Sequence, residues 1–130
     1  MFSFLLHHYN RFAQYLHEQA LPRKRSTHWK TVEKMFLKLH PSCEACGTTK
    51  HLQVHHIRAF HTNPELELSI ENLITLCMLR NFECHYIWGH LGRGGWKYNN
   101  ALIREDIELL KSGKVSWDEQ TKVILARKLQ

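Results

Sequence analysis

The sequence predicts a small α+β domain in which two short strands lie among amphipathic helices. The chain has 130 residues, enough for one modest hydrophobic core. Apolar residues recur at helical spacing in several stretches, whereas two shorter runs are rich in the aliphatic side chains of strands. Because 43% of the residues are hydrophobic and 23% are charged, we exclude a wholly disordered chain, a collagen-like repeat and a disulfide miniprotein.

The first half of the chain is expected to hold two helices. Residues 1–28 mix aromatic and basic side chains at helical spacing, and this stretch ends near Pro22. A second helix is expected from Trp29, with Thr27 as a possible N-cap and Pro41 as the stop. We expect three regions in all: a basic, aromatic N-terminal helical arm (1–28), a core (29–98) and a C-terminal helical extension (99–130).

The second half is expected to begin with strands and end with helices. Residues 52–57 predict a short strand, residues 60–69 a loop, and residues 71–77 either a second strand or a helical turn. Further on, Asn99 and Ser116 are each placed to cap a helix. The sheet is therefore expected to be small.

Net charge and the distribution of apolar residues indicate which partner and compartment to expect. There are 18 Lys and Arg against 12 Asp and Glu, a formal charge of +6, which favours nucleic acid over a membrane as partner, although a solvated surface explains it equally well. No uncharged run approaches the roughly 20 residues of a membrane helix. The opening MFSFLLHHY lacks the basic start and cleavage site of a signal peptide. We therefore expect a cytoplasmic protein without a membrane partner.

Four cysteines form two pairs. Cys43 and Cys46 are separated by two residues and followed by Gly47, which allows the tight turn of a zinc knuckle. A redox Cys-x-x-Cys would require a strand-to-helix context that is not evident here. Cys77 and Cys84 would complete a closed four-thiolate zinc site, although Cys77 alone also fits a buried core cysteine. The intervening MLRNFE must then bulge outward.

Between the cysteine pairs lies a histidine doublet. His55 and His56 point to opposite faces of the expected strand, so one can bind a metal while the other addresses water. Most isolated histidines have no such role, but this doublet is framed by β-branched residues. Asn72 and His85 follow it in the chain.

The ordered run CEACG…LQVHHI…ENLITLC…CH resembles the His-Asn-His (HNH) endonucleases over about residues 43–91. The resemblance implies a ββα-metal fold, a hairpin and a helix around one divalent cation. It implies that His56 is the general base and His55 a metal ligand, where many relatives have Asp. Asn72 matches the middle Asn, which holds the loop and orients the base or approaches the metal, and His85 matches the final His.

The resemblance also implies two kinds of metal: a structural Zn²⁺ and a catalytic Mg²⁺, Mn²⁺, Ni²⁺ or Zn²⁺. His90 follows His85 by five residues, which places the two about 140° apart on an α-helix. His90 could therefore replace or join His85 at the cation, and we favour His85. No small-molecule cofactor is expected.

Basic residues outside the motif are candidates for DNA contacts: Arg23, Lys24, Arg25, Arg93 and Lys97. For Arg23, Lys24 and Arg25 the alternative is a solvated charged turn. For residues 88–98, which hold Arg93 and Lys97, it is a packed linker. The sequence predicts a metal-dependent DNA endonuclease that nicks or cuts through one site. The alternatives are a non-catalytic zinc-ribbon nucleic-acid-binding module and a structural zinc adaptor. Whether the protein is a monomer or a dimer stays open.

Overall fold

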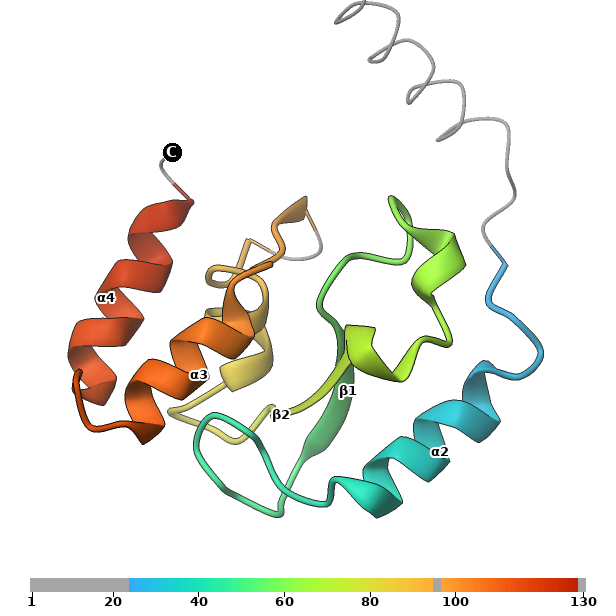
Figure 1. The fold of residues 1–130 in the computed structure, drawn as a ribbon, viewed down its shortest axis with the longest axis horizontal. Coiled ribbons are helices and arrows are strands. Elements are labelled where there is room, and N and C mark those ends of the chain that lie inside the picture. The colour runs from blue at the N-terminus through green and yellow to red at the C-terminus, as the bar shows by residue number, and fades with distance from the viewer. Residues whose placement is uncertain (1–23, 95–96, 129–130) are drawn as a thin grey trace, which may run out of the picture.

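A two-stranded antiparallel sheet lies at the centre of the molecule, with one helix on one side and two on the other (Figure 1). The computed structural model describes residues 24–94 and 97–128. The elements are α2 (Trp29–Leu39), β1 (Leu52–His56), the 3₁₀ turns η1 (Pro64–Leu66) and η2 (Ile70–Asn72), β2 (Leu73–Cys77), the π-helical turn η3 (His85–Gly89), α3 (Ile103–Lys111) and α4 (Trp117–Arg127). The α+β expectation is confirmed. The helix expected before Pro22 lies outside the described residues.

The hairpin pairs His56 with Leu73 and Leu52 with Cys77. Every residue of β2 is buried because both faces of this strand are covered. Leu73 packs with α2, whereas Ile74 and Leu76 pack with η3, α3 and α4. This alternation follows from the two-residue period of a strand. Residues 71–77 thus contain both alternatives that the sequence left open, a helical turn and then a strand.

Two of the expected helix caps have different outcomes. Thr27 does not cap α2: the N-cap position is His28, whose backbone N–H donates to the hydroxyl of Ser26. Ser116 does cap α4, because its hydroxyl accepts from the backbone N–H of Glu119 while the Glu119 carboxylate accepts from the N–H of Ser116. This reciprocal pair is a capping box, which satisfies two N–H groups at the helix start.

A buried polar network ties α3 and α4 to the turn η3. Asp106 is 1% exposed, and its carboxylate accepts from Arg127 at 2.6 and 2.7 Å and from Gln120 at 2.6 Å. Asn100 donates to the same carboxylate at 2.7 Å and to the backbone carbonyl of Trp88, in η3, at 2.9 Å. The C-terminal helices therefore support the segment from which two site histidines project.

Replacing Arg127 with alanine is expected to destabilise the protein by about 3 kcal/mol, because the buried Asp106 carboxylate loses its charged partner. The Arg127 side chain is 22% exposed, so we take the lower end of the range for a broken buried pair. Urea unfolding measures this loss. Lys122→Ala, at an exposed position of the same helix, is the matched control. Equal stability of the two variants would show that the ion pair contributes nothing.

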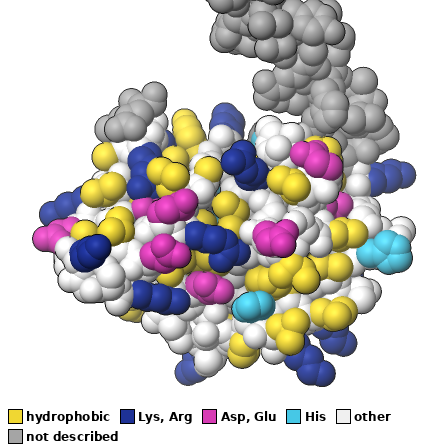
Figure 2. Space-filling model, viewed as in Figure 1, with side chains coloured by type: hydrophobic (Ala, Val, Ile, Leu, Met, Phe, Trp, Pro, Cys, Tyr) yellow, Lys and Arg dark blue, Asp and Glu magenta, His cyan; other side chains and the backbone are white. Residues whose placement is uncertain are grey.

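The surface mixes charges of both signs. On the face shown in Figure 2, Lys and Arg side chains are interspersed with Asp and Glu, and they do not gather in one basic patch. Met35 and Leu39 of α2 are 59% and 69% exposed. None of the helices in the described part of the chain has the length and apolarity required to cross a membrane. Positive charge is therefore not concentrated in one area of this face.

Candidate functional site

The four cysteines come together in one cluster, formed by Cys43, Cys46, Cys77 and Cys84. Their sulfur atoms all lie within 4.8 Å of one another, and those of Cys46 and Cys77 are 3.5 Å apart. Zn–S bonds of about 2.3 Å in a tetrahedron would place two sulfurs about 3.8 Å apart. Gly47 has a φ of +82° and closes the knuckle by donating to the carbonyl of Cys43 at 2.8 Å. The cluster has the geometry of a four-thiolate metal site.

The segment between Cys77 and Cys84 forms the expected bulge. Asn81 and Glu83 adopt left-handed conformations, with φ of 78° and 42°, and reverse the chain there. Cys84 returns beside Cys43, and a hydrogen bond from Cys84 lowers the pKa of Cys43 to about 5. The same bond raises the pKa of Cys84. One thiolate is therefore favoured before any metal binds, and a bound metal would deprotonate the others.

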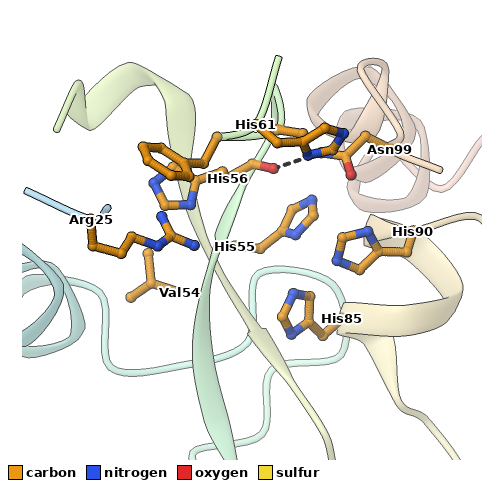
Figure 3. Close-up of a pocket in the computed structure, with 10 residues that line it drawn as sticks. Arg25, Val54, His55, His56, His61, His85, His90 and Asn99 are labelled. Atoms are coloured by element: carbon orange, nitrogen blue, oxygen red, sulfur yellow. Dashed lines mark hydrogen bonds between the residues drawn. The ribbon is translucent and has the colours of Figure 1, made fainter. Parts of the chain in front are cut away.

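Three histidines face one another across the gap between β1 and η3. His55 comes from the strand, and His85 and His90 come from the π-helical turn and the residue after it (Figure 3). Their ring centroids are 4.9 Å (His55 to His85), 4.7 Å (His55 to His90) and 5.0 Å (His85 to His90) apart. One nitrogen of each lies within 4.8 Å of the others. We call this set the histidine triangle.

The π-helical turn explains why His90 joins His85. An α-helix would separate the two side chains by about 140°. A π-helix closes its hydrogen bonds over five residues and so has more residues in each turn, which brings positions five apart closer to one face than an α-helix does. Gly89 suits the close approach of η3 to β1, because a Cβ there would lie only 3.2 Å from two ring atoms of His55 and 3.1 Å from Leu76. The separation of 140° expected between His85 and His90 assumed α-helical geometry, which this segment does not have.

Hydrogen bonds orient the rings of the histidine triangle. The Nδ1 of His85 lies 2.6 Å from the amide oxygen of Gln53, and the Nδ1 of His90 lies 2.8 Å from the carbonyl of Tyr98. Because both acceptors are oxygens, each Nδ1 donates and each Nε2 keeps a free lone pair.

Burial keeps two rings of the triangle neutral, and one ring nitrogen has no partner in the described part of the chain. Burial lowers the pKa of His55 well below its usual value and lowers that of His85 to about 4. The Nε2 of His55 is buried and has no hydrogen-bond partner among the described residues. A buried, unpaired nitrogen costs free energy unless something binds it. Three imidazoles whose nitrogens lie this close together fit a divalent cation.

His56 is held differently from its neighbour. Its ring points away from the histidine triangle (Figure 3). It packs on Trp29 at 4.5 Å between ring centroids. Its Nε2 lies 2.9 Å from the backbone carbonyl of Glu67 and must therefore donate, which leaves the lone pair on Nδ1. Burial lowers the pKa of His56. The strand thus places two histidines in one pocket: His55 belongs to the histidine triangle, and His56 lies outside it.

Comparison with protein families identifies this segment. Residues 43–87 match the family model described as HNH endonuclease. These residues form an HNH domain. The match spans the cysteine cluster and the hairpin, and it indicates nuclease activity. No curated protein and no solved structure gave a significant match. His90 lies beyond the matched residues, although the fold brings it to His55.

Asn72 of the HNH domain clamps the loop that leaves β1. Its amide oxygen accepts from the backbone N–H of Arg58 at 2.8 Å, and its amide nitrogen donates to the carbonyl of Arg58 at 3.0 Å and to that of Leu66 at 3.4 Å. Asn72 does not line the histidine pocket. Of the two roles that the resemblance implies, the geometry supports the one in which Asn72 holds the loop.

The site lies in a pocket of about 260 Å³. Among its lining residues are Arg25, His55, His56, Phe60, His61, His85, His90 and Asn99. Of the residues expected to contact DNA, Arg25 lines this pocket and Lys97 lines a neighbouring one. Lys24 is exposed, and Arg93 forms an ion pair with Glu83. Arg23 lies outside the described residues.

Sequence reasoning missed three residues that support the HNH domain: Gln53, Glu67 and Asn99. Asn99 does not cap α3, which begins at Ile103. Its amide instead donates to the carbonyl of His56 at 3.0 Å (Figure 3) and to that of Ile57 at 3.1 Å, which holds the end of β1. Alternation along β1 places Gln53 on the same face as His55, which was the one available signal.

Proposed function

We propose that the protein is a metal-dependent DNA endonuclease that hydrolyses phosphodiester bonds. The observation that carries this proposal is the pairing, in one pocket, of the histidine triangle with a histidine held outside it. The unpartnered Nε2 of His55 supports a cation at the triangle. The Nδ1 lone pair of His56 supports a base beside that cation. A zinc ribbon that only binds nucleic acid would need neither feature.

We infer that the cysteine cluster holds Zn²⁺, because soft thiolates in a closed set of four are typical of structural zinc. The histidine triangle would hold the catalytic cation. Neutral imidazoles suit Mn²⁺, Ni²⁺ and Zn²⁺ as well as Mg²⁺. When bound, a divalent cation supplies charge stabilisation to the phosphate oxygens and the leaving oxygen. Gln53 and the carbonyl of Tyr98 keep the Nε2 atoms of His85 and His90 directed at it.

His56 would take the proton of the attacking water at Nδ1. The hydrogen bond from its Nε2 to the Glu67 carbonyl fixes the ring and the tautomer, so that no reorientation is required during the reaction. Asn99 holds the backbone of His56 from the other side. The base and the strand end that carries it are therefore held before substrate arrives.

Basic residues around the pocket would contact the phosphates. Arg25 and Lys97 line adjoining pockets, and Lys24 is exposed nearby in the chain. We include Arg23 and Arg93 in this proposal as residues that contact the DNA outside the pocket. Contacts to the backbone carry no sequence information, so we expect cleavage with little sequence preference.

Supercoiled plasmid incubated with zinc-loaded protein tests the function. With Mn²⁺, Ni²⁺ or Mg²⁺ added, we expect nicked or linear products from the wild type and from His28→Ala, an exposed histidine outside the site. His90→Ala should cut at least tenfold more slowly at limiting cation, since it removes one ligand. Binding of the plasmid without cutting under every cation would contradict the proposal and favour the zinc-ribbon module.

A further inference from the structure

Glu67 is a buried acid whose side chain has no part in the reaction proposed above, which uses only its backbone carbonyl. The residue is 5% exposed and follows η1 in the loop between the two strands. Both of its carboxylate oxygens accept from the backbone N–H of Ser26 at 3.1 Å. One of them lies 3.8 Å from a guanidinium nitrogen of Arg25. Glu67 thus binds the chain before α2 and, through its carbonyl, the ring of His56.

Arg25 is fixed on three sides. Its guanidinium lies over the ring of Phe60 at 4.5 Å and over the ring of Trp29 at 5.1 Å, and Glu67 pairs with it from the loop. The side chain nevertheless stays 47% exposed and lines the pocket of the histidines. Such an arginine keeps free N–H donors toward solvent while its position is restricted.

We propose that Glu67 is a positioning residue. It holds the guanidinium of Arg25 at the edge of the pocket, where this group contacts a phosphate of the DNA at a fixed position relative to the base His56. This inference rests on the proposed function. A free arginine side chain loses much rotamer freedom when it binds a phosphate, and prior ordering removes that cost. Because the carbonyl of the same residue holds His56, the contact and the base share one support.

Stability alone is a poor explanation for this ion pair. A pair with one partner half exposed contributes little to folding, because water screens it. Both oxygens of the buried carboxylate also accept from the backbone N–H of Ser26 without any contribution from Arg25. What the pair adds is the direction of the guanidinium, which two aromatic rings then maintain.

A double-mutant cycle tests the inference on zinc-loaded protein without added divalent cation, with labelled duplex DNA as the probe. Glu67→Gln keeps an oxygen for the N–H of Ser26 but removes the charge that orients Arg25. We expect Glu67→Gln and Arg25→Ala each to raise the Kd about tenfold, and the double variant to raise it no further. The control is Glu65→Gln, at an exposed acid of the same loop.

Two further readouts separate positioning from a structural role. Arg25→Ala should reduce the salt slope of log affinity by about 0.9, the value for one lost phosphate contact. In the cleavage reaction, Glu67→Gln should raise KM and leave kcat nearly unchanged, with zinc content and thermal midpoint like those of Glu65→Gln. A Kd for Glu67→Gln equal to that of the control would overturn the inference, as would a multiplicative loss in the double variant. If the wild type does not cut DNA, the proposed nuclease activity is wrong. The Kd values would still test the role of Glu67, because the binding measurements require no cleavage.

Discussion

Replacing His56 with alanine is expected to slow DNA cleavage by about 10²–10⁴-fold, the contribution of a positioned general base. His56 lies outside the histidine triangle, so both metals should remain bound. Single-turnover cleavage at saturating Mn²⁺ measures the chemical step. The loss should persist at every Mn²⁺ concentration, because additional cation does not replace the missing base.

The side chain of His56 packs on Trp29, so the alanine variant also leaves a cavity. His56→Gln fills more of that space without supplying a base of comparable strength, and it should be equally slow. Wild-type rates in both variants would place the base elsewhere. His28→Ala, which should cut like the wild type, controls for the loss of a histidine.

Replacing Cys84 with serine is expected to unfold the protein at room temperature. Cys84 is fully buried within the cysteine cluster. Structural zinc contributes about 10–16 kcal/mol to folding in small zinc domains. That matches or exceeds the whole stability of a typical domain, about 5–15 kcal/mol. Zinc analysis and circular dichroism on the purified variant measure the outcome.

The control for this variant is Ser42→Ala, which changes a residue beside the cluster that contributes no thiol. It should keep stoichiometric zinc and a cooperative thermal transition. If Cys84→Ser stays folded with a full complement of zinc, the fourth ligand is another residue. His85, next in the chain, would then be the first to examine.

Residues whose chemistry depends on local spacing could be found in the sequence. Cys43, Cys46 and Gly47 make a knuckle within five positions, and its turn is closed by the short hydrogen bond from Gly47 to Cys43. The doublet of His55 and His56 presents two faces because a strand alternates. Neither inference requires knowledge of distant contacts.

Other features depend on tertiary contacts, so local spacing could not determine their roles. His90 reaches the triangle through a π-helical turn, and helical periodicity assumes α-helical spacing. Asn99 reads as a helix cap in sequence, but its amide is used 43 residues away at the carbonyl of His56. Glu67 reads as a solvated loop acid until Ser26, 41 residues earlier, is placed beside it.

The most direct test of the account is to titrate Mn²⁺ into zinc-loaded protein and to count bound Mn²⁺ by electron paramagnetic resonance. The histidine triangle predicts about one Mn²⁺ per chain in the wild type and in His56→Ala, and binding at least tenfold weaker in His90→Ala. This pattern would show that His90 is a ligand and His56 is not. Mn²⁺ binding that is lost in His56→Ala but kept in His90→Ala would contradict the account.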